Sequence, residues 1–164
     1  MCRSLFVLPL AIAIAAVAAS LSAHAAQAPA APSVFAGHWM LDVAKSTYSP
    51  GPTPKSQHAT LTVVANGIRT VAERVEADGS VTRFDWTGTF DGVDRPVKGD
   101  PNRDTVSLRR LDEYTIEFTN KKAGRVTTTI HAEYAKDGRS RVETTTGTNA
   151  KGKPVHNVTY WTKS

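Results

Sequence analysis

Tight-turn dipeptides recur at short intervals along this chain and constrain its fold more than any other feature. Asn-Gly and Asp-Gly supply the positive φ angles of two-residue hairpin turns, so their regular spacing predicts strands that are neighbours both in sequence and in space. The turn pairs are Asn66-Gly67, Asp78-Gly79, Asp91-Gly92, Ala123-Gly124, Asp137-Gly138 and Lys151-Gly152. The pattern predicts an antiparallel meander.

The segments between these turns are rich in Thr, Val, Ile and aromatic residues, which suit a pleated, half-buried strand. No long window shows the apolar stripe of a helix. The predicted strands are Gly37 to Val43, Ala59 to Val64, Ile68 to Glu76, Val81 to Phe90, Arg95 to Lys98, Thr105 to Leu111, Thr115 to Lys121, Arg125 to Ala135, Ser140 to Thr148 and Val155 to Lys163.

Three of these strands alternate clearly between an apolar and a polar face, so one face is predicted to be buried and the other solvated. The apolar faces are Phe84, Trp86, Gly88 and Phe90; Tyr114, Ile116 and Phe118; and Val126, Thr128, Ile130, Ala132 and Tyr134. The segments 68–76 and 142–148 are mixed on both faces, and a bulge there would exchange the two sets. Their facing is left open.

A flat sheet of this many strands would expose two long edges, which invite pairing with other chains. Closure into a barrel removes the edges. A two-sheet sandwich is the alternative, but its crossovers need longer connections than the short turns seen here. We therefore predict an all-β fold, an antiparallel up-and-down meander that closes into a barrel of about eight to ten strands.

The first residues have the order of a secretory signal. Arg3 precedes an apolar run from Leu5 to Leu21, and the triplet Ala23, His24, Ala25 has the small-residue pattern of a cleavage site. We expect a signal peptide over residues 1–25, cleaved near Ala25, rather than a membrane span. The alanine-rich leader is typical of bacteria, so a periplasmic or secreted location is expected.

The residues that follow the leader predict one domain. Residues 26–33 contain only Ala, Gln, Pro and Ser and predict a disordered tether, which leaves residues 34–164 for the barrel. Cys2 is the single cysteine and precedes the apolar run, so the mature chain would have neither a lipid anchor nor a disulfide. The formal net charge of +5 falls to +4 with the loss of Arg3 and is not gathered on one face, which argues against a nucleic-acid partner.

The triplet Gly37-His38-Trp39, on the first predicted strand, resembles the G-x-W signature of the calycins, the superfamily of lipocalins, fatty-acid-binding proteins and avidins. In that family the tryptophan closes the base of the barrel, and a basic side chain near the end of the last strand stacks across its indole. The resemblance implies that Gly37, Trp39 and Lys163 have these barrel-closing roles. A cation over an indole contributes about 0.5 to 2 kcal/mol.

The long segment from Ala44 to His58 is predicted to be a loop because it contains Pro50, Pro52 and Pro54. It resembles the long first loop of the lipocalins and departs from the two helices that fatty-acid-binding proteins have there. The T-D-Y triplet of the lipocalins is missing, so the resemblance does not supply a ligand class.

The candidate metal sites lack the spacing that metal binding needs. His38, His58, His131 and His156 form no ligand pattern with one another, although haem ligation by a single histidine stays open as an alternative. Asp100, Asn102 and Asp104 have the first spacings of a calcium loop, but Thr105 and Leu111 occupy its glycine and glutamate positions. We expect an Asx turn there, and neither a metal nor a cofactor.

No catalytic constellation is found, so the chain is not expected to be an enzyme. There is no G-x-S-x-G motif, and the adjacent Asp112 and Glu113 lie at a turn. A small-barrel enzyme is kept as the second alternative. It would require a polar cluster inside the barrel, which the alternation patterns do not display; the threonine-rich strand Val142 to Thr148 is the one place where the interior could be polar.

The expected function is to bind a small hydrophobic or amphipathic molecule, because a small barrel encloses room for one ligand. The candidate lining residues are Phe84, Trp86, Phe118 and Tyr134, with Arg141 as a counter-charge for an acidic ligand. The first alternative is a filled barrel that acts as a periplasmic protein-interaction or inhibitor module. The sequence leaves open the ligand, the oligomeric state and whether the interior is empty.

Overall fold

The computed structural model describes residues 34–98, 100–149 and 152–164. The predicted signal peptide (1–25) and tether (26–33) lie outside the described residues. In the part of the chain that is described, no helix has the length and apolarity needed to cross a bilayer.

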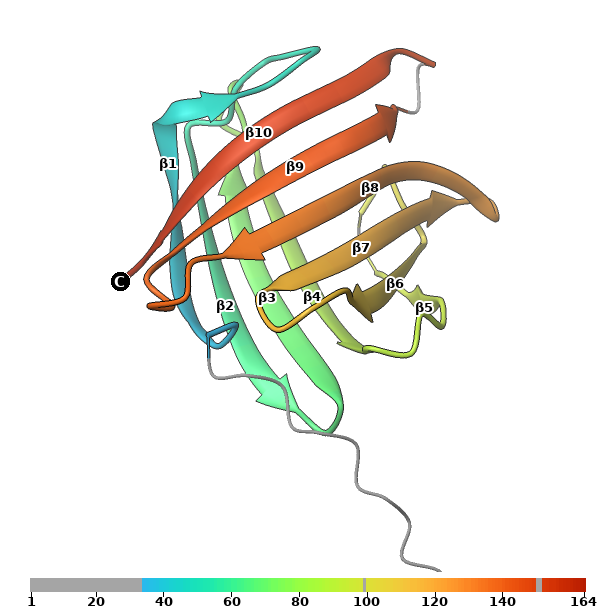
Figure 1. Cartoon of the computed structure of the whole chain (residues 1–164). Coiled ribbons are helices and arrows are strands. Elements are labelled where there is room, and N and C mark those ends of the chain that lie inside the picture. Colours follow the sequence, from blue (N-terminus) through green and yellow to red (C-terminus); the bar gives the residue numbers. More distant parts are fainter. Residues whose placement is uncertain (1–33, 99, 150–151) are drawn as a thin grey trace, which may run out of the picture.

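The described chain forms ten antiparallel strands joined mainly by short turns (Figure 1). Their order in the sheet is β4-β3-β2-β1-β10-β9-β8-β7-β6-β5. Every hydrogen-bonded neighbour is also a sequence neighbour except β1 and β10, which join the two ends of the meander; the predicted all-β meander is confirmed. The strands are β1 (Gly37–Thr47), β2 (Ser56–Val64), β3 (Gly67–Val75), β4 (Val81–Thr89), β5 (Arg95–Pro96), β6 (Thr105–Arg110), β7 (Thr115–Lys122), β8 (Arg125–Tyr134), β9 (Ser140–Thr148) and β10 (Pro154–Lys163).

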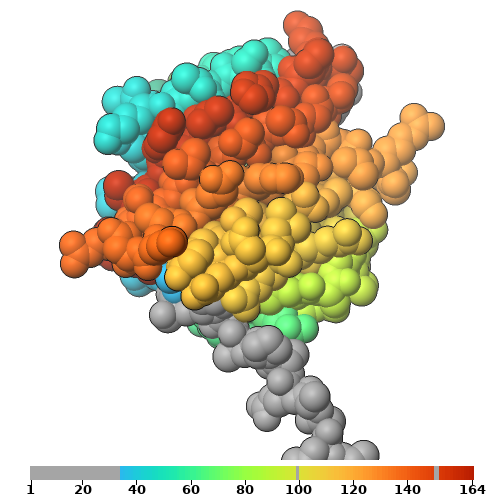
Figure 2. Space-filling model, in the orientation of Figure 1, coloured from blue at the N-terminus to red at the C-terminus, as the bar shows by residue number. Residues whose placement is uncertain are grey.

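The sheet curls until its two ends nearly meet. Just beyond β4, Asp91 forms a bridge with Arg109 of β6, and Gly92 N donates a hydrogen bond of 2.9 Å to Leu108 O. β1 to β4 form one wall and β6 to β10 the facing wall, and Figure 2 shows the second wall as a continuous surface. The predicted barrel is therefore confirmed as a nearly closed one, and this architecture is compatible with a calycin-like fold.

The core lies between the two walls and includes the end of the barrel where β1 begins. Phe35 and Trp39 are fully buried there. Burial of such large apolar side chains is the main favourable term in folding a chain without a disulfide, at about 25 cal/mol per Å² of apolar surface. The other buried apolar residues are Ala59, Leu61, Ile68, Trp86, Val97, Val106, Leu108, Ile116, Ala132, Tyr134 and Trp161.

Two sequence-based expectations about strand geometry were wrong. The loop predicted from Ala44 to His58 is shorter, because β1 continues past a shift in register and pairs Thr47 with Val158, while β2 already begins at Ser56. Val126 was expected to be buried but is 58% exposed, because the register of β7 and β8 shifts between Asn120 and Lys121. The bulge reverses which face of the sheet Val126, near the start of β8, points to.

Candidate ligand cavity

Three of the predicted lining residues come together between the walls. Phe84 and Trp86 of β4 have ring centroids 6.5 Å apart, and the Phe118 ring of β7 lies 6.2 Å from Trp86. Trp86 is buried in the core and does not line the interior cavity described below, whereas Phe84 and Phe118 pack against the core from half-buried positions and do line it. These three aromatic rings therefore form a continuous row from β4 in one wall to β7 in the other.

Tyr134 lies apart from this row of aromatic rings. Its ring packs at the base of the barrel, with centroids 4.8 Å from Phe35 and 5.3 Å from Trp39, and it does not line the cavity beside Phe84 and Phe118. Burial raises the pKa of the Tyr134 hydroxyl to about 12. Its surroundings are those of a core residue.

Two cations lie over the ring of Trp39 at the base. The Nζ atom of Lys163 is 4.9 Å from the ring centroid and the Cζ atom of Arg141 is 4.8 Å from it. Burial lowers the pKa of Lys163, and the nearby charge of Arg141 lowers it further. Lys163 Nζ also donates a hydrogen bond of 3.3 Å to Val34 O. The lysine thus joins the last strand to the residues before the first.

Gly37 makes room for the lysine. A Cβ atom at residue 37 would lie 2.8 Å from Lys163 Cε, and the residue has a φ of +140°. Both conditions favour glycine over any residue with a side chain. In this protein, the glycine of the G-x-W triplet lets the lysine stem reach the indole of Trp39.

Arg141 is 4% exposed and almost fully engaged within the protein. Its Nη1 donates a hydrogen bond of 2.8 Å to the Tyr134 hydroxyl, and its Nη2 lies 3.0 Å from Glu143 Oε1. The guanidinium also lies over Trp161, 4.6 Å from the ring centroid. Only its Nε atom is buried without a hydrogen-bond partner. The arginine expected to balance an acidic ligand therefore already has a protein partner at each terminal nitrogen.

An internal cavity of about 180 Å³ lies above this base. Its apolar lining comes from both walls and consists of Ala59, Ala72, Phe84, Phe118, Ile130 and Trp161. A second cavity of about 410 Å³ shares Trp161, Ile130 and several polar residues with the first and extends to Tyr48, Pro50 and Pro52. The proline-containing loop thus borders the mouth of the barrel. Burial is the main cause that raises the pKa of Tyr48 to about 12.

The interior also contains a cluster of three arginine–carboxylate pairs. The Arg74 and Glu76 side chains approach to 3.1 Å, those of Arg103 and Asp100 to 2.7 Å, and those of Arg141 and Glu143 to 3.0 Å. All six residues line the 180 Å³ cavity. The clearly alternating strands did not predict this cluster. Segments 68–76 and 142–148, whose facing was left open, contribute Arg74, Glu76 and Glu143 to it, so the polar interior expected to be possible at 142–148 is present there.

A signal for this cluster was present in the sequence. Arg74 and Glu76 are two residues apart, as are Arg141 and Glu143, and residues at that spacing share a face of a strand. The repeated R-x-E pattern therefore indicates two charged pairs, and the two members of each pair lie on the same face of their strand. Arg103 lies in a loop, and no periodicity could have placed it; its guanidinium lies 4.2 Å from the ring centroid of Phe84 and donates a hydrogen bond of 2.8 Å to Asn120 Oδ1.

Several buried polar atoms of the interior have no hydrogen-bond partner within the protein. Thr70 Oγ1 and Arg141 Nε both belong to residues that line the cavity. Arg74 Nε lies 3.1 Å from Glu76 Oε2 but lacks the geometry of a hydrogen bond, and Trp86 Nε1 is also unpaired. An unpaired buried polar group costs about 1 to 3 kcal/mol. Water or a ligand that accepts hydrogen bonds would remove this cost.

Three of the residues considered for metal binding contact other groups of the protein. Asp100 Oδ1 accepts a hydrogen bond of 2.8 Å from Asn102 N, as an Asx turn does, and Asp104 Oδ2 accepts one of 2.8 Å from Ala123 N. His131 lies 2.9 Å from Glu117 and is half exposed. Over the described ranges, no three His, Cys, Asp or Glu side chains gather as a metal site would require.

No protein-family model matches this sequence, and a search of the curated proteins finds no match either.

Proposed function

We propose that this protein is a calycin-like binding barrel that holds one small amphipathic molecule with an acidic or otherwise hydrogen-bond-accepting end. The single observation that carries the proposal is the composition of the 180 Å³ cavity, in which aromatic side chains face unpaired hydrogen-bond donors. Ligand sites in proteins combine a mostly apolar lining with a few convergent polar groups. The leader of the sequence supports a periplasmic or secreted site of action.

The proposed orientation follows from the lining. The apolar part of the ligand would lie against Phe84, Phe118 and Trp161, and its accepting end would approach Thr70 Oγ1 and Arg141 Nε. The volume of about 180 Å³ suits a group about the size of one aromatic ring. A longer ligand would continue into the mouth, beneath Tyr48 and Pro50.

Catalysis is the second candidate, because the interior does contain the polar cluster that a small-barrel enzyme requires. Each of its carboxylates is already paired with an arginine, so none is free to accept a proton from a substrate. This pairing favours binding over catalysis.

Fluorescence titration with two naphthalene probes tests the proposal. Anilinonaphthalene sulfonate carries an anionic end, whereas N-phenylnaphthylamine has the same rings without it. We expect saturable binding of the sulfonate with at least about tenfold higher affinity than the neutral probe, since hydrogen bonds to a charged group are worth about 1.5 to 3 kcal/mol. Equal affinity for the two probes would contradict the acidic end, and absence of saturable binding would contradict the cavity as a site.

Two adjacent positions on β3 provide a matched pair of variants. Ala72→Leu adds volume inside the cavity, whereas Val71→Leu adds volume on the outer face, where Val71 is 41% exposed. Loss of sulfonate binding in Ala72→Leu alone would place the probe inside the barrel. If both variants still bind the sulfonate, the probe binds elsewhere on the protein. Native mass spectrometry of the full chain from its own host would then identify the bound molecule.

A further inference from the structure

The barrel is open along one strand. β4 stands at an end of the sheet and pairs only with β3, while β5 at the other end pairs only with β6. The two ends meet beyond the last residue of β4, at the bridge between Asp91 and Arg109. From Val81 to Thr89, β4 is therefore an edge strand. A free edge of this length has a row of backbone groups ready to pair with another strand.

The direction of these backbone groups follows from the register. Glu76 N donates to Ser80 O, and Phe90 N donates to Asn66 O, both at 2.8 Å. Hydrogen-bonded positions alternate along an antiparallel pair, so the even-numbered residues of β4 bond to β3. The backbone N–H and C=O groups of the odd-numbered residues point away from β3; these residues are Val81, Arg83, Asp85, Thr87 and Thr89.

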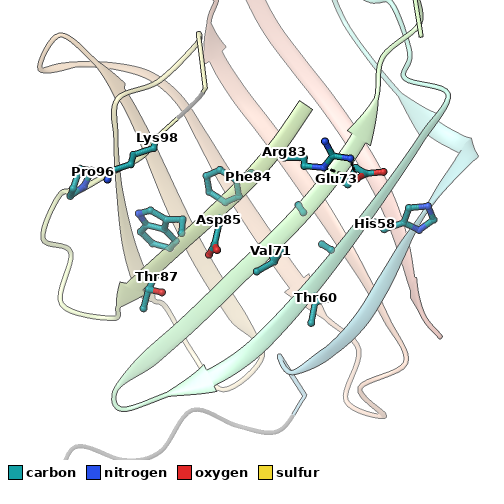
Figure 3. Close-up of a pocket in the computed structure, with 13 residues that line it drawn as sticks. His58, Thr60, Val71, Glu73, Arg83, Phe84, Asp85, Thr87, Pro96 and Lys98 are labelled. Atoms are coloured by element: carbon teal, nitrogen blue, oxygen red, sulfur yellow. Dashed lines mark hydrogen bonds and ion pairs between the residues drawn. The ribbon is translucent and has the colours of Figure 1, made fainter. Parts of the chain in front are cut away.

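The structure leaves space beside this edge. A cavity of about 780 Å³ lies along β2 to β4 at this edge, lined by side chains from both faces of these strands, and reaches Pro96 and Lys98 across the gap. Figure 3 shows Asp85 and Thr87 on β4, with Pro96 and Lys98 on the chain segment opposite. In the described residues, no strand of this chain fills the gap.

The outer face of β4 has two opposite charges beside this edge. Arg83 forms an ion pair of 2.9 Å with Glu73 of β3, and Asp85 forms one of 2.7 Å with Arg69. The side chains of Arg83 and Asp85 are still 76% and 57% exposed, so both can meet a further partner. Charges on an edge strand usually prevent pairing, because like charges would meet. Here the order of the charges decides which pairing they permit.

We propose that β4 pairs with β4 of a second copy of this chain, antiparallel, with the twofold axis at Phe84. In this register Arg83 lies opposite Asp85 of the second copy, and Asp85 lies opposite its Arg83. Both residues belong to the odd-numbered series, so their free backbone groups meet as well. A twofold interface of this kind uses the same surface on both copies.

The neighbouring registers are less favourable. An axis at Arg83 or at Asp85 keeps the backbone pairing but places two like charges directly opposite each other, which destabilises a sheet. The axis at Phe84 instead extends the alternation of charge across the interface, from Glu73 through Arg83 to Asp85 of the second copy. The charge pattern is thus self-complementary in that register.

Sedimentation equilibrium of the full chain, with two charge reversals, tests the proposal. We expect the unmodified chain to form dimers as its concentration rises. Arg83→Asp places two acidic pairs at the interface and Asp85→Arg places two basic pairs, so each should raise the dimer dissociation constant at least about tenfold. Glu133→Arg, an equal change of charge on exposed β8, should leave it unchanged.

Mixing the two reversed variants gives the decisive result. A chain with Arg83→Asp and a chain with Asp85→Arg form two complementary pairs with each other, so the equimolar mixture should dimerise more tightly than either variant alone. A mixture that dimerises no more tightly than the separate variants would overturn the proposal, and so would an unmodified chain that stays monomeric at every concentration. Circular dichroism checks that both variants are folded.

Hydrogen exchange locates the interface without any substitution. The backbone N–H groups of Arg83, Asp85 and Thr87 should exchange rapidly in the monomer and become protected as the concentration rises. Those of Phe84 and Trp86, bonded to β3, should be protected at all concentrations. A dimer that leaves Arg83 and Asp85 unprotected would overturn the proposal. None of these readouts depends on ligand binding, so the result is independent of the proposed function.

Discussion

Arg141 donates a hydrogen bond of 2.8 Å to the hydroxyl of Tyr134, the residue directly opposite it across β8 and β9. The pair is buried beneath the interior cavity and is joined to Trp39, Trp161 and Glu143 by the same guanidinium. The base of the barrel and the floor of the candidate site therefore share one side chain. A change at Arg141 should affect both stability and binding.

Arg141→Ala should lower the free energy of unfolding by about 3 to 5 kcal/mol, because it leaves Glu143 unpaired inside the barrel and removes the cation above the aromatic rings. Urea unfolding followed by tryptophan fluorescence measures the change. Arg139→Ala, at an exposed position two residues earlier, should change it by less than about 0.5 kcal/mol. Equal effects of the two substitutions would show that the buried network adds nothing.

Gly37→Ala should lower the free energy of unfolding by about 1 to 3 kcal/mol, because the added Cβ would strain a left-handed φ and meet the Lys163 stem. The matched control is Gly51→Ala, where the φ is not left-handed and the nearest atoms to an added Cβ lie at 3.8 Å. Thermal unfolding compares the two variants. An unchanged midpoint for Gly37→Ala would refute the explanation given for the G-x-W glycine.

Acid should weaken the seam between β4 and β6. Asp91 accepts two hydrogen bonds from the Arg95 guanidinium, at 2.9 and 2.8 Å, and one of 2.6 Å from the Thr89 hydroxyl. With a further bond from Val93 N, they hold the pKa of the Asp91 carboxyl well below its usual range, the Arg95 bonds contributing most.

The sign of the effect follows from this depressed pKa. As the pH falls, the unfolded chain takes up a proton at Asp91 first, near pH 4. The stabilisation is complete above that pH and is lost progressively as the pH falls through the folded-state pKa. Urea midpoints measured from about pH 6 to pH 2 should therefore decline less steeply in Asp91→Asn than in the unmodified chain. If the urea midpoints of the two proteins declined equally with falling pH, Asp91 would not be a source of the acid sensitivity.

Much of the fold is determined by local sequence. Dipeptides such as Asn66-Gly67 and Asp137-Gly138 reverse the chain within a few residues, and period-two alternation orients strands such as β4 and β7, so the meander and most strand positions follow without tertiary information. Phe84, Trp86 and Phe118 were predicted to share the inside for the same reason, because they alternate with polar neighbours.

What local sequence could not determine involves contacts between distant segments. The bulge that exposes Val126 depends on how β8 meets β7, and the inward position of Arg74 and Arg141 on their strands depends on a carboxylate partner beside each of them. Arg103 reaches Phe84 from a loop.

The sequence by itself determined an all-β meander of hairpins with an apolar inner face, because turns and alternation act over a few residues. Only the tertiary structure decided that the barrel has a charged interior and that β4 keeps a free edge. Burying Arg141 is favourable only when Glu143, Tyr134 and the aromatic rings surround it, and an edge is free only when the curvature of the whole sheet leaves it unpaired.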